Sequence, residues 1–115
     1  MNKEVIQTSD INIKVGLNEE KMPVRIDWEA SDNPAGTQLA KAMLLSFFDD
    51  ETRDTFKIDL WTTEMQVMEM DRFFFQTLRG LADTYFRATQ NNELAADMQR
   101  FVDYFGQKTG ILPKE

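Results

Sequence analysis

Carboxylates are the side chains of this sequence whose spacing could do chemistry. Asp49, Asp50, Glu51 and Asp54 lie close together, and clustered carboxylate oxygens are the ligands that hold Ca²⁺ or Mg²⁺ in proteins. The cluster lacks the central glycine and the terminal glutamate of an EF-hand loop, and Arg53 lies inside it. We therefore interpret it as a solvated hairpin turn and predict no metal site.

A second possible arrangement is an acid pair formed by Asp27 and Asp59. Each lies in a segment of alternating polar and apolar residues, so the two carboxylates would be neighbours if those segments paired, as in a glycosidase site. Arg25 and Lys57 each lie two residues away. The more economical interpretation is that both aspartates are exposed charges of a sheet.

The absence of two residue types excludes most other mechanisms. The sequence has no histidine and no cysteine, so it has no Ser-His-Asp triad, no thiol nucleophile and no ordinary zinc or copper site. Its five glycines are too dispersed to form a phosphate-binding loop. We predict a protein that is not an enzyme, with no catalytic residues, no cofactor and no metal.

The charge and the apolar runs limit the possible partners. The net charge is -7, which repels phosphate groups, so neither nucleic acid nor an anionic membrane is an expected partner. The longest apolar run, residues 42–48, is interrupted by Ser46 and is too short to cross a bilayer. With no secretory leader at the start, these features predict a water-soluble cytoplasmic protein that does not insert into membranes.

Four segments have the pattern of strands. Residues 11–17, 24–28 and 55–61 alternate between polar and apolar side chains, the period of a half-buried strand. Residues 42–48 are apolar on every side, which suits a buried helix or a strand; we favour a strand because a polar turn and an alternating segment follow. Two hairpins are therefore expected, joined by a loop, with a helical turn over residues 37–41.

The period changes after Trp61 to that of helices. Thr63 and Gln66 fit a capping box, and Asn91 and Asn92 separate a first helix from a second that ends near Gly110. We predict a single α+β domain over residues 1–115. Its order is ββββαα: a four-stranded antiparallel sheet built from two hairpins, followed by two C-terminal helices packed on one face. Residues 1–9 are expected to be a flexible or edge-pairing segment.

The first helix carries more apolar surface than one core contact needs. Phe73, Phe74 and Phe75 are consecutive and so span about 200° of the helix. A second stripe widens the apolar arc to about 220°; it consists of Met68, Phe75, Ala82 and Phe86. The second helix has one narrow stripe, formed by Leu94, Met98, Phe101, Val102 and Phe105.

Two explanations of the wide arc are open. The first helix packs on the sheet with one side and on the second helix with the other, or one side contacts a partner protein or a second copy. The strand over residues 42–48 raises the same question, because Leu44 and Phe48 oppose its other apolar side chains. The predicted protein interface consists of Phe48, Met68, Phe75 and Phe86.

The order and spacing of seven segments resemble those of the GldC proteins associated with gliding motility in bacteria. The segments are residues 14–17 (KVGL), 26–28 (IDW), 40–46 (AKAMLLS), 58–62 (IDLWT), 73–78 (FFFQTL), 82–89 (ADTYFRAT) and 103–105 (DYF). The resemblance covers nearly the whole chain, and no single motif is specific. It implies a cytoplasmic accessory protein of gliding without enzymatic activity or cofactor, and it supplies no functional residues.

Three functional hypotheses follow. The first is a non-enzymatic, protein-binding accessory factor whose partner belongs to the gliding machinery or its associated secretion machinery. The second is a small, chaperone-like homo-oligomer that holds unfolded chains on exposed apolar surface. The third and weakest is a carboxylate-based enzyme that depends on a divalent metal.

Overall fold

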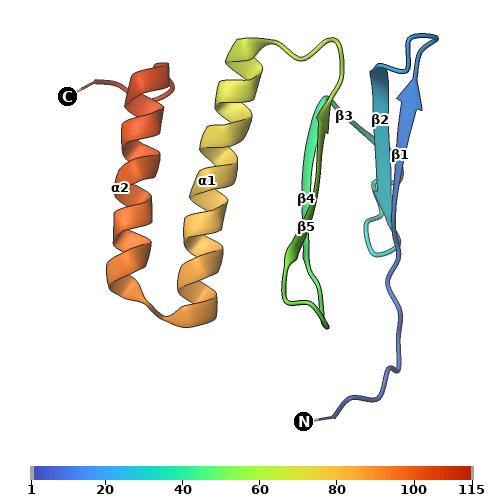
Figure 1. Ribbon diagram of the computed structural model, residues 1–115, viewed down its shortest axis with the longest axis horizontal. Coiled ribbons are helices and arrows are strands. Elements are labelled where there is room, and N and C mark those ends of the chain that lie inside the picture. Colours follow the sequence, from blue (N-terminus) through green and yellow to red (C-terminus); the bar gives the residue numbers. More distant parts are fainter. Residues whose placement is uncertain (1, 115) are drawn as a thin grey trace. The chain divides into compact units, whose positions relative to one another are not determined.

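The computed structural model describes residues 2–114 and divides the chain into two compact units. Strands make up the first unit, which ends at Met65, and helices make up the second, which begins at Gln66 (Figure 1). The predicted α+β class, with two helices after the strands, is confirmed. The prediction of one domain whose helices cover the sheet stays a prediction.

Three strands form the first sheet, in the order β1-β2-β3. Their bounds are β1 Ile11–Leu17, β2 Pro23–Ala30 and β3 Gln38–Ala40. All neighbours are antiparallel, with Val15 opposite Ile26 and Ile26 opposite Ala40. Ile26 is almost completely buried, as expected for the central strand of this sheet. Residues 2–10 have no regular structure, although Ser9 Oγ donates a hydrogen bond of 2.6 Å to Asp32 Oδ2.

Two strands form the second sheet: β4 Ala42–Phe48 and β5 Thr55–Trp61. Both have the bounds that the sequence pattern predicts, and the preference for a strand over a helix at 42–48 is confirmed. They pair antiparallel along their whole length, from Ala42 opposite Trp61 to Phe48 opposite Thr55.

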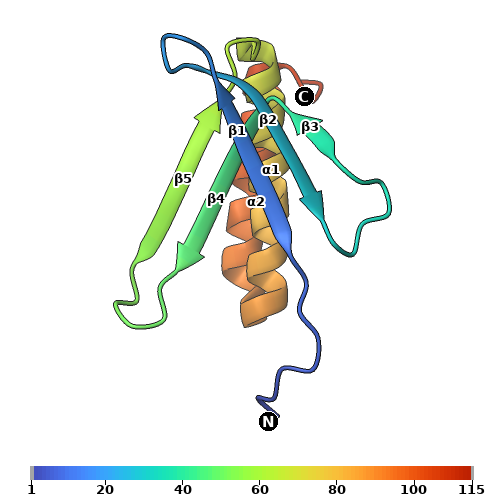
Figure 2. The same cartoon turned by 90° about the vertical axis from the view of Figure 1, so that its right-hand side faces the viewer.

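The predicted single four-stranded sheet is wrong. The loop segment expected to form a helical turn over residues 37–41 instead contains β3, which pairs with β2 through Leu39 opposite Asp27. Only Lys41 separates β3 from β4, and the chain changes direction there (Figure 2). Because of this bend, β4 pairs with β5 and not with β2, so the strands divide into two sheets.

Both hairpin turns are held by the side chain of their first residue. Asn18 Oδ1 accepts hydrogen bonds from the backbone N–H groups of Glu20 and Met22, at 2.9 and 3.0 Å. Asp49 Oδ2 likewise accepts from Glu51 and Thr52, at 3.1 and 2.9 Å. Short polar side chains at these positions replace backbone hydrogen bonds that the turn cannot make.

The helical unit is an antiparallel pair formed by α1 Val67–Thr89 and α2 Asn92–Thr109 (Figure 1). The capping box at the start of α1 joins Gln66 and Glu69, three residues after the predicted one. Asn91, one of the two residues predicted to separate the helices, caps α2, since its side chain accepts from the backbone N–H of Leu94 at 3.1 Å. Gly110 ends α2 with a φ of 80°, a conformation that suits glycine.

Small residues of α2 form its contact with α1. The buried side chains of α1 are Phe75 and Ala82, and the buried residues of α2 are Ala95, Val102 and Gly106. The Cβ that an alanine would add at position 106 would lie 2.7 Å from Phe75 Cε1 and 2.7 Å from Leu112 Cδ1. Glycine at this position therefore lets the Phe75 ring and the C-terminal Leu112 pack against the helix backbone.

Candidate protein interface

The four residues of the predicted interface lie in different surroundings. Phe48, at the end of β4, has an exposed fraction of 69%, and Met68, in the first turn of α1, one of 80%. Phe86, near the end of α1, is 37% exposed. Phe75 is only 7% exposed and lies in the core between the helices.

The helical unit does not bring these residues into one surface. Met68 and Phe86 are both on α1 but eighteen residues apart, which places them about 27 Å apart along the helix axis. Phe75 lies between them and is covered by α2. The second apolar stripe of α1 is therefore mainly the stripe that packs on α2.

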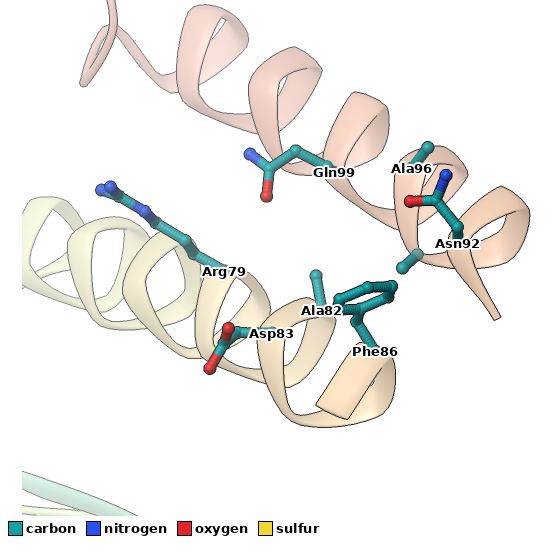
Figure 3. Close-up of a pocket in the computed structure, with 8 residues that line it drawn as sticks. Arg79, Ala82, Asp83, Phe86, Asn92, Ala96 and Gln99 are labelled. Atoms are coloured by element: carbon teal, nitrogen blue, oxygen red, sulfur yellow. The ribbon is translucent and has the colours of Figure 1, made fainter. Parts of the chain in front are cut away.

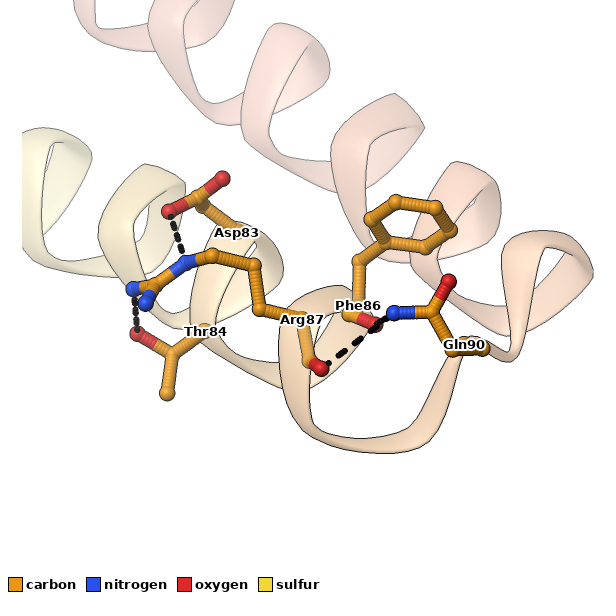
Figure 4. A network of polar contacts seen from close by, with 5 residues as sticks. All are labelled: Asp83, Thr84, Phe86, Arg87 and Gln90. Atoms are coloured by element: carbon orange, nitrogen blue, oxygen red, sulfur yellow. Dashed lines mark hydrogen bonds and ion pairs between the residues drawn. The ribbon is translucent and has the colours of Figure 1, made fainter.

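A hollow of about 450 Å³, lined by both polar and apolar side chains, lies on one side of the helix pair. Figure 3 shows Phe86 and Ala82 at its floor, with Arg79, Asp83 and Gln99 around it. Asp83 is already engaged, because its Oδ2 accepts from Arg87 Nε at 3.0 Å. The same arginine contacts Thr84 Oγ1, and Gln90 donates to the carbonyl oxygens of Phe86 and Arg87 (Figure 4). These contacts fix the last turn of α1.

The opposite side of the helix pair is apolar. Phe74 and Leu81 each precede a buried residue of α1, and Leu94 and Phe101 each precede a buried residue of α2. The residue before a buried one points about 100° away from the helix contact. Because the two helices are antiparallel, this rotation brings the preceding residues of both helices to the same side of the pair. We name this surface the helical apolar face; its exposed members are Phe74 (38%), Leu81 (52%), Leu94 (47%) and Phe101 (52%).

The sequence pattern does not separate this face from the core. It assigns Leu94 and Phe101 to the one apolar stripe of α2, together with Val102. In the structure, Val102 packs on α1 with Ala95 and Gly106, and the larger side chains lie beside that contact. The sequence feature that could have identified the contact with α1 is the set of small residues at positions 95, 102 and 106. Their spacings of seven and four residues place them on one side of a helix.

The β4–β5 hairpin has one wholly apolar face. The cross-strand pairs on it are Met43 with Leu60, Leu45 with Ile58, and Phe47 with Phe56. Phe47 and Phe56 are exposed, and so is Phe48 on the opposite face. On that opposite face Lys57 Nζ lies 2.7 Å from Asp59 Oδ2.

Three of the carboxylates singled out in the sequence, Asp27, Asp49 and Asp59, make local contacts in the structure. Asp27 and Asp59 belong to different sheets, and each pairs with the basic residue two positions before it, at 3.1 Å for Arg25 Nε and 2.7 Å for Lys57 Nζ. The N–H groups of Thr52 and Glu51 lower the pKa of Asp49, because they donate hydrogen bonds to its charged form. Between residues 2 and 114, no three acidic side chains come together in a way that could hold a metal ion.

The described part of the chain contains no helix that is long and apolar enough to cross a membrane. Both helices carry charged residues along their length, including Arg72, Arg79 and Arg87 on α1.

A family model described as "Gliding motility-associated protein GldC-like" matches residues 23–111, which is more than half of the chain. Neither the comparison with curated proteins nor the comparison with solved structures gives a match. The matched range begins at the first residue of β2 and ends just after α2, so it includes the hairpin β4–β5 and both helices.

Proposed function

The chain belongs to the GldC-like family of gliding motility-associated proteins, and on that basis we propose that it is a non-enzymatic, protein-binding accessory factor of bacterial gliding. In this proposal the protein acts in the cytoplasm, and its partner is a component of the gliding machinery or of the secretion machinery associated with it. Membership of the family supports a role in gliding, and the surface of the helical unit supports the binding of another protein.

The observation that carries the proposal is the helical apolar face. Phe74, Leu81, Leu94 and Phe101 are large side chains on one side of the helix pair, and each is 38% to 52% exposed. Burial of apolar surface stabilises a complex by about 25 cal/mol per Å², and aromatic residues at the centre of such a patch contribute most to affinity.

The geometry favours an amphipathic helix as the element of the partner that binds. Two antiparallel helices leave a groove between them along their whole length, and a third helix packs its apolar residues into such a groove. The helical unit carries as many basic as acidic residues between positions 66 and 114, six of each, so it does not select a strongly charged partner.

A chaperone-like role is the second candidate, and the β4–β5 hairpin favours it. Its exposed apolar side chains, among them Phe47, Phe48 and Phe56, would suit transient contact with unfolded chains. The two functions differ in specificity. A chaperone slows the aggregation of unrelated unfolded proteins, whereas an accessory factor with one partner does not.

The proposal is tested by substitution on the two sides of the helix pair. In a gliding bacterium whose own copy of the gene is replaced, Phe101→Glu and Leu81→Glu place a charge on the helical apolar face. The matched control is Gln99→Glu, which places the same charge at the hollow on the opposite side of the pair. We expect the first two variants to keep their circular dichroism spectrum and lose gliding, and the control to glide normally.

Two results would contradict the proposal. If Phe101→Glu and Leu81→Glu glide normally, the face has no role in the process. If both variants lose helical structure when purified, these side chains are needed for the fold of the chain and are not available for a partner.

A further inference from the structure

Along the outer edge of β5, alternate residues point their backbone N–H and C=O groups away from β4, where no strand of the described residues pairs with them. Lys41 O accepts from Thr62 N at one end of the hairpin, and Asp54 O accepts from Asp49 N at the other, at 2.7 and 2.9 Å. In an antiparallel ladder, hydrogen-bonded pairs alternate with non-bonded pairs, so Phe56, Ile58 and Leu60 direct their N–H and C=O groups towards β4. The outward residues are therefore Thr55, Lys57, Asp59 and Trp61.

This edge lacks two of the features that protect other edges, a proline and a bulge, and its two charged residues, Lys57 and Asp59, have opposite signs. In the described sheets, β5 has one strand neighbour only, is seven residues long, and contains neither proline nor a bulge. The outer strand β1, by contrast, has an irregular register between Gly16 and Leu17 and a lysine at its centre, Lys14. Two copies of β1 paired about their centres would place Lys14 against Lys14, which disfavours that contact.

The sequence of β5 is complementary to itself. If two copies pair antiparallel about a twofold axis through Ile58, Lys57 lies opposite the partner's Asp59, and Asp59 lies opposite the partner's Lys57. Phe56 then lies opposite the partner's Leu60. The outward residues meet only outward residues, so their backbone groups can form a regular ladder.

The charges also select this register. A slip of two residues in one direction places Lys57 opposite the partner's Lys57, and a slip in the other places Asp59 opposite the partner's Asp59. Both slips replace attraction by repulsion. The free edge of β4 contains no charged residue between Ala42 and Phe48, so nothing comparable fixes a register there.

We propose that two copies of the chain join through the outer edges of β5, about a twofold axis at Ile58, with Lys57 of each copy paired to Asp59 of the other. The contact converts the hairpin into a four-stranded sheet in the order β4-β5-β5-β4. A two-stranded hairpin alone is marginal in water, and four strands are stable. The apolar side chains of both hairpins then form one continuous face, and the edge of β5 is no longer exposed.

The test is a charge exchange across the axis, measured by sedimentation equilibrium on the full chain. Lys57→Asp places two carboxylates opposite each other at both contacts, and Asp59→Lys places two ammonium groups opposite each other there. We expect the natural chain to form a dimer and each variant alone to dimerise at least about tenfold more weakly, because two like-charge contacts replace two favourable ones. In an equimolar mixture of the two variants, a Lys57→Asp chain can pair with an Asp59→Lys chain, so that each carboxylate lies opposite an ammonium group. The like-charge contacts are then avoided, so the mixture forms a mixed dimer.

A second variant tests the axis itself. Ile58→Cys places two thiols opposite each other in a non-hydrogen-bonded pair, and the chain has no other cysteine. Mild oxidation is expected to cross-link it into a covalent dimer, whereas Lys57→Cys, whose partner is Asp59, stays uncross-linked.

The proposal is overturned if the natural chain sediments as a monomer, if the single variants dimerise as well as the natural chain, or if their mixture does not recover the dimer. It does not rest on the proposed function, because the helical apolar face takes no part in it. A protein that dimerises through β5 but has no gliding partner would contradict the proposed function and leave the β5 contact standing.

Discussion

At the residue scale, Asp49 shows how a sequence cluster with the chemistry of a metal site is used for structure. Asp49 begins the acidic run, yet its carboxylate accepts hydrogen bonds from two backbone N–H groups of its own turn. Asn18 makes the same kind of contact in the other hairpin without a charge. The similarity supports the interpretation of the run as a turn, which the sequence favoured for different reasons.

The lowered pKa of Asp49 predicts how the turn depends on pH. A carboxylate whose pKa is lowered on folding stabilises the folded state above its unfolded pKa, near 3.8, and the contribution is lost as the pH falls through the folded value. Asp49→Asn should therefore melt at a lower temperature than the natural chain at pH 7, and the difference should shrink below pH 3.8. Tryptophan fluorescence, to which Trp61 of the same hairpin contributes, measures the transition.

Asp50→Asn is the matched control for this experiment. Asp50 is the neighbouring carboxylate of the same turn and does not hold the turn as Asp49 does, so its substitution should leave the melting temperature unchanged at both pH values. Equal effects of the two substitutions would show that the net charge of the turn matters, and not the hydrogen bonds of Asp49.

At the element scale, periodicity predicted strands and helices well, and it failed where the chain changes direction. Three residues, Gln38–Ala40, are too few to show a period, so the pattern could not reveal β3. The bend at Lys41 then divides the strands into two sheets, and alternation along a strand contains no information on which neighbour it pairs with. The start and end of α2 were found because capping depends on side chains close in sequence, whereas α1 begins three residues after the predicted start.

The helix contact predicts opposite effects of the same substitution at two glycines. Gly106→Ala adds a methyl group 2.7 Å from Phe75 Cε1 and from Leu112 Cδ1, and overpacking of this kind costs about 1–3 kcal/mol. Gly80→Ala adds its methyl group where no atom outside the local helix backbone lies within 4 Å, and alanine is favoured over glycine in a helix by about 1 kcal/mol. Thermal unfolding followed by the circular dichroism of the helices should show a lower melting temperature for the first and a higher one for the second.

A stabilising effect of Gly106→Ala would contradict the close contact between Phe75 and the backbone of α2. It would mean that helix propensity outweighs packing at this position, and that the small residues of α2 are not required for its contact with α1.

At the scale of the whole molecule, the fold class and the family could be predicted from the sequence, whereas the helical apolar face could not. The predicted interface grouped residues because their side chains are large and apolar. It included Phe75, which the structure places in the core between the helices. Which side of a helix is core depends on where its neighbour packs, and α2 packs through its small residues. The helical apolar face became visible only with that contact known.

The central claim is that the protein acts by binding another protein through the helical apolar face. The most direct measurement replaces Phe101 by a photo-crosslinking amino acid in gliding cells, with the same replacement at Gln99 as the control. We predict that light joins position 101 to one different protein, that position 99 gives no such product, and that Leu81→Glu abolishes it. Cross-linking of position 101 only to residues of the same chain, or equal cross-linking from both positions, would contradict the claim.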